Sequence, residues 1–75
     1  MSMVEDLAEQ LAEDTLKAMS DLEDDRFFME VAAELAAAST TLEEAFLTAI
    51  RVRLAERKAR AFIKGRVDGS IKPPG

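Results

Sequence analysis

A cationic segment near the carboxyl end carries the side chains best suited to bind a charged partner. The segment RVRLAERKARAFIKGR, residues 51–66, holds seven of the ten basic residues and a single acid in a chain of net charge −5. Because an α-helix has 3.6 residues per turn, four of these cations fall on one face. This basic stripe consists of Arg53, Arg57, Arg60 and Lys64.

Two kinds of partner suit the basic stripe. Clustered Lys and Arg release counterions from nucleic acid, so the stripe could contact phosphates. It could also complement the acidic half of a neighbouring subunit, because residues 1–44 carry a net charge of −11 and residues 45–75 a net charge of +6. The second interpretation is favoured, since acids dominate the chain and it has no Tyr or Trp to stack on bases. A helix-turn-helix is disfavoured because Glu43 and Glu44 would lie in the first turn of its recognition helix and face the DNA.

An acidic cluster, SDLEDDRF at residues 20–27, has the spacing of a calcium loop but lacks its essential residues. Asp21, Glu23 and Asp25 could occupy the first three ligand positions. The turn glycine would then be Arg26 and the bidentate glutamate would be Ala32. Helix capping explains the acids better, and we expect no metal and no cofactor.

Catalytic chemistry finds little support in the sequence. His and Cys are absent, which removes the usual general base and the thiolate nucleophile. All three glycines lie in the last eleven residues, so no glycine-rich phosphate loop precedes a helix. We expect a non-enzymatic protein with no catalytic residues.

The elements that must carry these side chains are helices. The chain is 48% hydrophobic and 33% charged, with apolar residues at helical spacing, which predicts an all-α fold. We expect a small three-helix bundle with helices at about 3–21, 24–38 and 41–64, a helical domain over 1–65 and a flexible, extended tail over 66–75. Ser2 with Glu5 forms a capping box that predicts the start of the first helix. Thr40 with Glu43, or Thr41 with Glu44, forms a second capping box at the start of the third helix. Gly65 is the predicted stop of the third helix.

The third predicted helix has two apolar seams, whereas a surface helix of a bundle needs only one. It is therefore either a central helix with a wide buried face in a monomer or a helix that faces another chain. One seam comprises Leu47, Ile50 and Leu54, with Phe46 beside it; the other comprises Thr48, Val52, Ala55, Ala59 and Phe62. A core of 75 residues without disulfides is marginal, so we expect oligomerisation to complete it. The Leu47 seam is predicted to pack against another chain, and the Phe62 seam against the first two helices.

These patterns predict an interaction protein or adaptor that forms homo-oligomers and docks on a larger protein through the third helix and the tail. The expected protein contacts are Phe46, Leu47, Ile50, Leu54, Val67 and Ile71. The alternative is a nucleic-acid-handling accessory subunit, such as a small packaging or remodelling factor, that uses Arg53, Arg57, Arg60 and Lys64. The opening residues MSMVEDLAEQ do not resemble a signal peptide, so we expect a cytoplasmic protein without a membrane partner.

Overall fold

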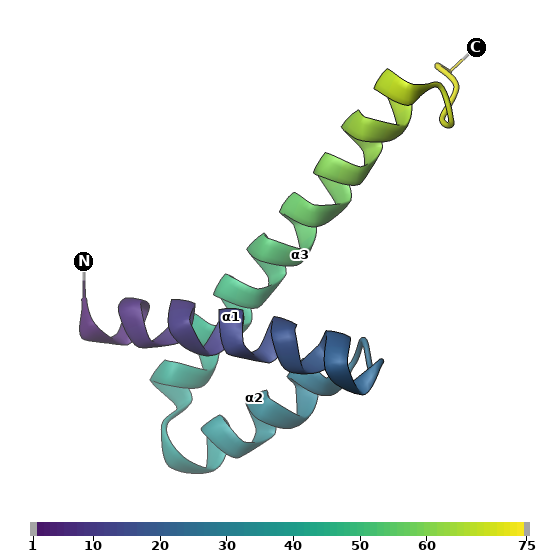
Figure 1. The fold of residues 1–75 in the computed structure, drawn as a ribbon. Coiled ribbons are helices and arrows are strands. Elements are labelled where there is room, and N and C mark those ends of the chain that lie inside the picture. Colours follow the sequence, from purple (N-terminus) through teal and green to yellow (C-terminus); the bar gives the residue numbers. More distant parts are fainter. Residues whose placement is uncertain (1, 75) are drawn as a thin grey trace.

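The chain folds into three α-helices, described here for residues 2–74 in a computed structural model (Figure 1). They are α1 (Met3–Leu22), α2 (Phe27–Ala38) and α3 (Thr40–Asp68). The described residues contain no strand, which confirms the predicted all-α class. Both α1 and α2 pack against the first half of α3, while its second half extends beyond them (Figure 1). Among the described residues, no helix is both long and apolar enough to cross a bilayer.

The start and end of α1 follow from local hydrogen bonds. Ser2 is the N-cap, and its hydroxyl accepts from the Glu5 amide at 3.1 Å. At the other end Glu23 adopts a left-handed conformation with φ of 52°, and the amide of Asp24 donates to the Met19 carbonyl at 3.0 Å. This closing motif ends a helix without proline, and a glycine usually fills the left-handed position. The predicted break at 22–24 therefore occurs, although α2 begins only at Phe27.

The start of α3 differs from the prediction. Ser39 is its N-cap, and the Ser39 hydroxyl accepts from the Leu42 amide at 3.1 Å. The predicted capping boxes at Thr40 and Thr41 are wrong, because both threonines already lie inside the helix. Three hydroxyl residues in a row can all serve as caps, and Ser39 is the one with extended backbone.

The end of α3 also lies beyond its predicted stop. The helix continues through Gly65 to Asp68 and ends at Gly69, whose φ is 84°. Residues 66–68 therefore belong to α3 and not to an extended tail. Gly65 is buried within the helix because the chain turns back after Gly69 and lays Ile71 over it.

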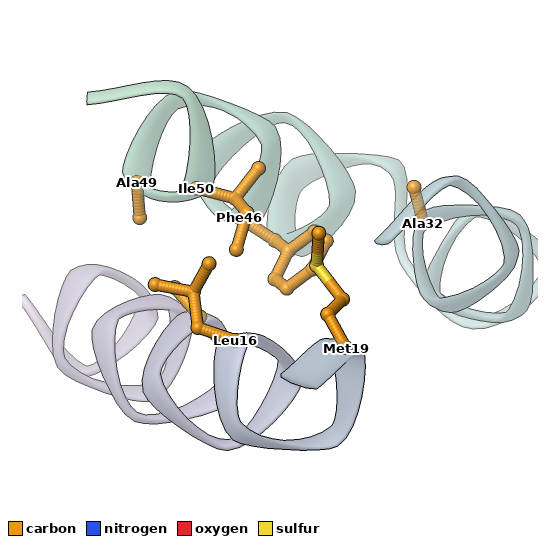
Figure 2. Packing of buried hydrophobic residues seen from close by; sticks show 7 residues of the cluster. Leu16, Met19, Ala32, Phe46, Ala49 and Ile50 are labelled. Carbon is orange, nitrogen blue, oxygen red and sulfur yellow. The ribbon is translucent and has the colours of Figure 1, made fainter. Parts of the chain in front are cut away.

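The core lies where α1, α2 and the first half of α3 meet (Figure 2). Phe46 and Ile50 of α3 are both fully buried and point toward Leu16 and Met19 of α1. The core cluster consists of Ala12, Leu16, Met19, Ala32, Phe46, Ala49 and Ile50. Leu47 and Leu54 are partly buried and pack against it. Phe46 and Ile50 thus lie in the chain's own core, and Leu47 and Leu54 pack against that core, whereas the sequence predicted that all four contact another chain.

The molecule is elongated for its size. A compact domain of 75 residues has a radius of gyration of about 11 Å, whereas this chain has 15.2 Å and extents of 48 × 29 × 19 Å. The cause is α3, whose 29 residues span about 43 Å at 1.5 Å per residue. Its second half projects from the three-helix body.

Candidate interaction surface on the projecting helix

The projecting part of α3, residues 55–68, is hereafter called the arm. Every residue from 55 to 64 is exposed, because α1 and α2 end before they reach this part of α3. In Figure 1 the arm is the green segment that leaves the body as a single rod. A lone helix gains nothing from tertiary packing, and in proteins such packing supplies most of a helix's stability.

An apolar seam runs along α3 on the face that points away from the core. It comprises Val52, Ala55, Ala59 and Phe62, and it is called the outer seam below. Val52 is 63% exposed, Phe62 46%, and the neighbouring Ile63 61%. The four positions lie about 120–180° around the helix from Phe46 at 100° per residue, so they cannot share its contacts. The prediction that this seam packs against the first two helices is wrong.

The choice between the two seams of α3 has a physical reason. Free energy from apolar burial grows with the area removed from water. The Phe46, Ile50 and Leu54 side chains offer far more area than Ala55 and Ala59. The body therefore closes over the bulky seam, and the alanine-rich seam is left outside.

A shallow apolar groove lies beside the outer seam, at the base of α3. Small side chains from two helices line it: Ala8 of α1, and Ala45 and Ala49 of α3. Thr48 and Val52 connect the groove to the outer seam, and two carboxylates, Glu5 and Glu9, complete its lining. Sequence analysis missed this groove, although Ala45 and Ala49, four residues apart on one helix face, are the kind of signal that could have revealed it.

The basic stripe begins on the body and continues along the arm. At the base, Arg53 binds Glu9 at 2.5 Å and Glu13 at 3.2 Å, both on α1. The hydrogen bonds that Arg53 donates to Glu9, together with the charges of both carboxylates, raise the pKa of Arg53 above its ordinary value. Arg53 thus pairs with acids of its own α1, whereas the sequence analysis expected the acidic half of a neighbouring subunit.

The remaining cations of the stripe lie farther along α3. Arg57 borders a depression that also has Asp24 and Asp25 in its lining. Arg60 pairs with Glu56 one turn earlier at 3.0 Å. Arg57, Arg60 and Lys64 are all exposed. The stripe and the outer seam occupy opposite faces of the arm, so the arm is amphipathic.

Residues 66–75, the predicted tail, include the last residues of α3 and a segment that folds back onto Gly65. The Ile71 amide donates to the Gly65 carbonyl at 3.0 Å. Asp68 accepts hydrogen bonds from the amide and the hydroxyl of Ser70, and these two bonds lower the pKa of the Asp68 carboxyl. Val67 is 83% exposed, whereas Ile71 packs on Gly65. Ile71 therefore has a local structural role that the sequence did not indicate.

Within residues 2–74, no group of three or more carboxylates is placed to hold a metal ion. Hydrogen bonds are the main cause of the pKa shifts of Arg53 and Asp68. No protein-family model, no curated protein and no solved structure matches the chain.

Proposed function

We propose that the chain is a non-enzymatic interaction protein that binds a polypeptide helix along the outer seam of α3. The observation that supports this is the exposure of Val52, Phe62 and Ile63 on a helix that projects from its own core. Contiguous apolar surface bordered by polar residues is typical of a protein-binding site. In the proposed assembly the arm serves as the docking element of a small adaptor.

The pattern of the outer seam favours a helical partner. Its residues recur at spacings of three and four, which is the pattern by which one helix packs along another. Alanines at positions 55 and 59 allow the two helix axes to approach closely. Phe62 then supplies the large anchor that such interfaces usually contain.

Site-specific photo-crosslinking tests this proposal. A photoreactive amino acid replaces Ala59 on the outer seam, and in a matched control it replaces the exposed Met29 on α2. Both full-length variants are expressed in the cells that normally make the protein. We expect a discrete polypeptide adduct from position 59 and none from position 29. Equal labelling at both positions, or no adduct at position 59, would overturn the proposal.

A second candidate function is contact with nucleic acid through the basic stripe. It is favoured by the exposure of Arg57, Arg60 and Lys64 on an arm that extends away from the acidic body. Three phosphate contacts predict a log–log salt slope of about −3 for binding to duplex DNA. A titration of the full chain with DNA at several salt concentrations decides the matter. Absence of binding at low salt would eliminate this candidate.

A further inference from the structure

We infer that the partner of the outer seam is a second copy of the chain, packed antiparallel so that Phe62 and Ile63 of each arm enter the groove of the other copy. This inference rests on the proposed function, because it identifies what binds the same surface. Shape and charge support it independently.

The shapes of the arm and the groove are complementary. The groove has small side chains in its lining, Ala8, Ala45 and Ala49, and therefore has room for large ones. Phe62 and Ile63 are large, exposed and unused by the chain's own core. They lie about 14 residues, or about 21 Å, along α3 from Thr48 in the groove. An antiparallel two-fold arrangement places each pair opposite the other copy's groove. Ala55 of each copy then lies near the two-fold axis, and Ala59 lies opposite Val52 of the other copy.

Such an arrangement closes on itself. Both copies contribute the same groove and the same arm, so the interface is isologous and forms a dimer instead of an open chain of subunits. Each Phe62 would fill a groove that the monomer leaves empty. The outer seam and the groove at the base of α3 are thereby buried in the same interface.

Charge favours the antiparallel orientation over the parallel one. Residues 1–44 carry a net charge of −11, and residues 45–75 carry +6. The basic stripe faces away from this interface, but Lys58 and Arg66 are exposed beside the outer seam at 100° per residue. An antiparallel dimer places these two cations beside the other copy's acidic body, where Glu5 borders the groove. A parallel dimer would place arm against arm and body against body, and like charges facing each other across an interface are costly.

The size of the seam sets the expected affinity. Stable dimers bury about 800 Å² per partner, and a seam of four residues with Ile63 beside it offers less. We therefore expect a weak dimer with a dissociation constant of about 10–100 μM. Replacement of Phe62 by alanine removes the main anchor and should weaken association at least about tenfold.

Sedimentation equilibrium of the intact chain tests self-association. Samples span about 10 μM to 1 mM, which brackets the expected dissociation constant. The Phe62→Ala variant should reach the same degree of association only at concentrations at least about tenfold higher. Met29→Ala, which removes an exposed side chain on α2, should associate like the wild type. Circular dichroism should show that both variants remain folded. A wild-type chain that stays monomeric at the highest concentration overturns the inference, as does unchanged association of Phe62→Ala.

Disulfide trapping tests the orientation, because the chain contains no natural cysteine. Variants Thr48→Cys and Ile63→Cys are oxidised separately and as a mixture. In the antiparallel dimer residues 48 and 63 of different copies lie opposite each other, whereas identical residues are about 22 Å apart and too distant to bridge. We expect a dimer from the mixture only. Self-linking of either single variant, or no link in the mixture, overturns the antiparallel geometry.

These outcomes separate the inference from the proposed function. If photo-crosslinking at position 59 yields an adduct with a different protein and the pure chain stays monomeric, the outer seam remains a binding site and the second copy is excluded. If the partner is a second copy, photo-crosslinking at position 59 should yield an adduct with twice the mass of the 8.2 kDa chain.

Discussion

Replacement of Phe46 by alanine should remove much of the free energy of unfolding of this chain. The Phe46 side chain is fully buried where α1, α2 and α3 meet, so the change leaves a cavity that the surrounding helices can fill only in part. Loss of a buried phenylalanine costs about 3–5 kcal/mol. A domain of 75 residues has a total stability of about 4–11 kcal/mol at the usual 0.05–0.15 kcal/mol per residue. The variant is therefore expected to be close to unfolding.

Phe62→Ala is the matched control, because it deletes the same ring from the same helix. Phe62 is 46% exposed and lies outside the core cluster, so the expected loss is within about 0.5 kcal/mol. Urea denaturation followed by far-ultraviolet circular dichroism measures both values, at protein concentrations below the expected dissociation constant of the dimer. Phe46→Leu serves as a milder variant in case Phe46→Ala does not fold at all.

The comparison of the two phenylalanines can refute the reasoning. If Phe62→Ala lowers the free energy of unfolding more than Phe46→Ala does, the outer seam belongs to the core. The packing described for α3 would then be reversed, and both proposals would lose their surface.

Three further predictions concern the helix ends. Glu23→Gly should raise the free energy of unfolding by about 0.5–1 kcal/mol in thermal denaturation, because glycine tolerates the left-handed conformation. Glu23→Gln is the control, and it should give no gain because glutamine has the same backbone strain as glutamate. Ser39→Ala should cost about 1 kcal/mol in urea denaturation by removing the N-cap of α3, while Thr40→Ala should be nearly neutral; equal losses would contradict the cap assignment. The Asp68–Ser70 hydrogen bonds should be intact above the ordinary aspartate pKa of about 3.9 and be lost as the pH falls through the lower folded value, because the folded state favours the ionised carboxylate. The Ser70 amide shift in an NMR pH titration reports this, and a midpoint at or above the ordinary value would contradict it.

The sequence was sufficient to predict the helices because their signals are local. Apolar spacing of three and four residues, together with Ser2 before Glu5, depends only on neighbours along the chain. The all-α class followed directly, whereas the sequence left open whether the first two helices were separate or one kinked helix. The ends were less accurate because several residues compete for each local role. Ser39, Thr40 and Thr41 can all cap a helix, and Gly65 and Gly69 can both end one.

Contacts outside the helical pattern determined the end of α3 and the partners of Arg53. Gly65 remains helical because Ile71 folds back over it, and Gly69 takes the left-handed position instead. Arg53 binds Glu9 and Glu13, which lie 44 and 40 residues away in the sequence, so no local pattern could predict its partners.

The two seams of α3 show this difference most clearly. Both repeat at spacings of three and four, and periodicity alone does not say which one the body covers. The tertiary structure selects the seam of Phe46 and Ile50, since its larger side chains remove more apolar area from water against α1. The short reach of α1 and α2 then leaves Phe62 exposed on the arm. The sequence by itself determined that α3 would be apolar on two faces, and only the packing of three helices determined which face remained available to a partner.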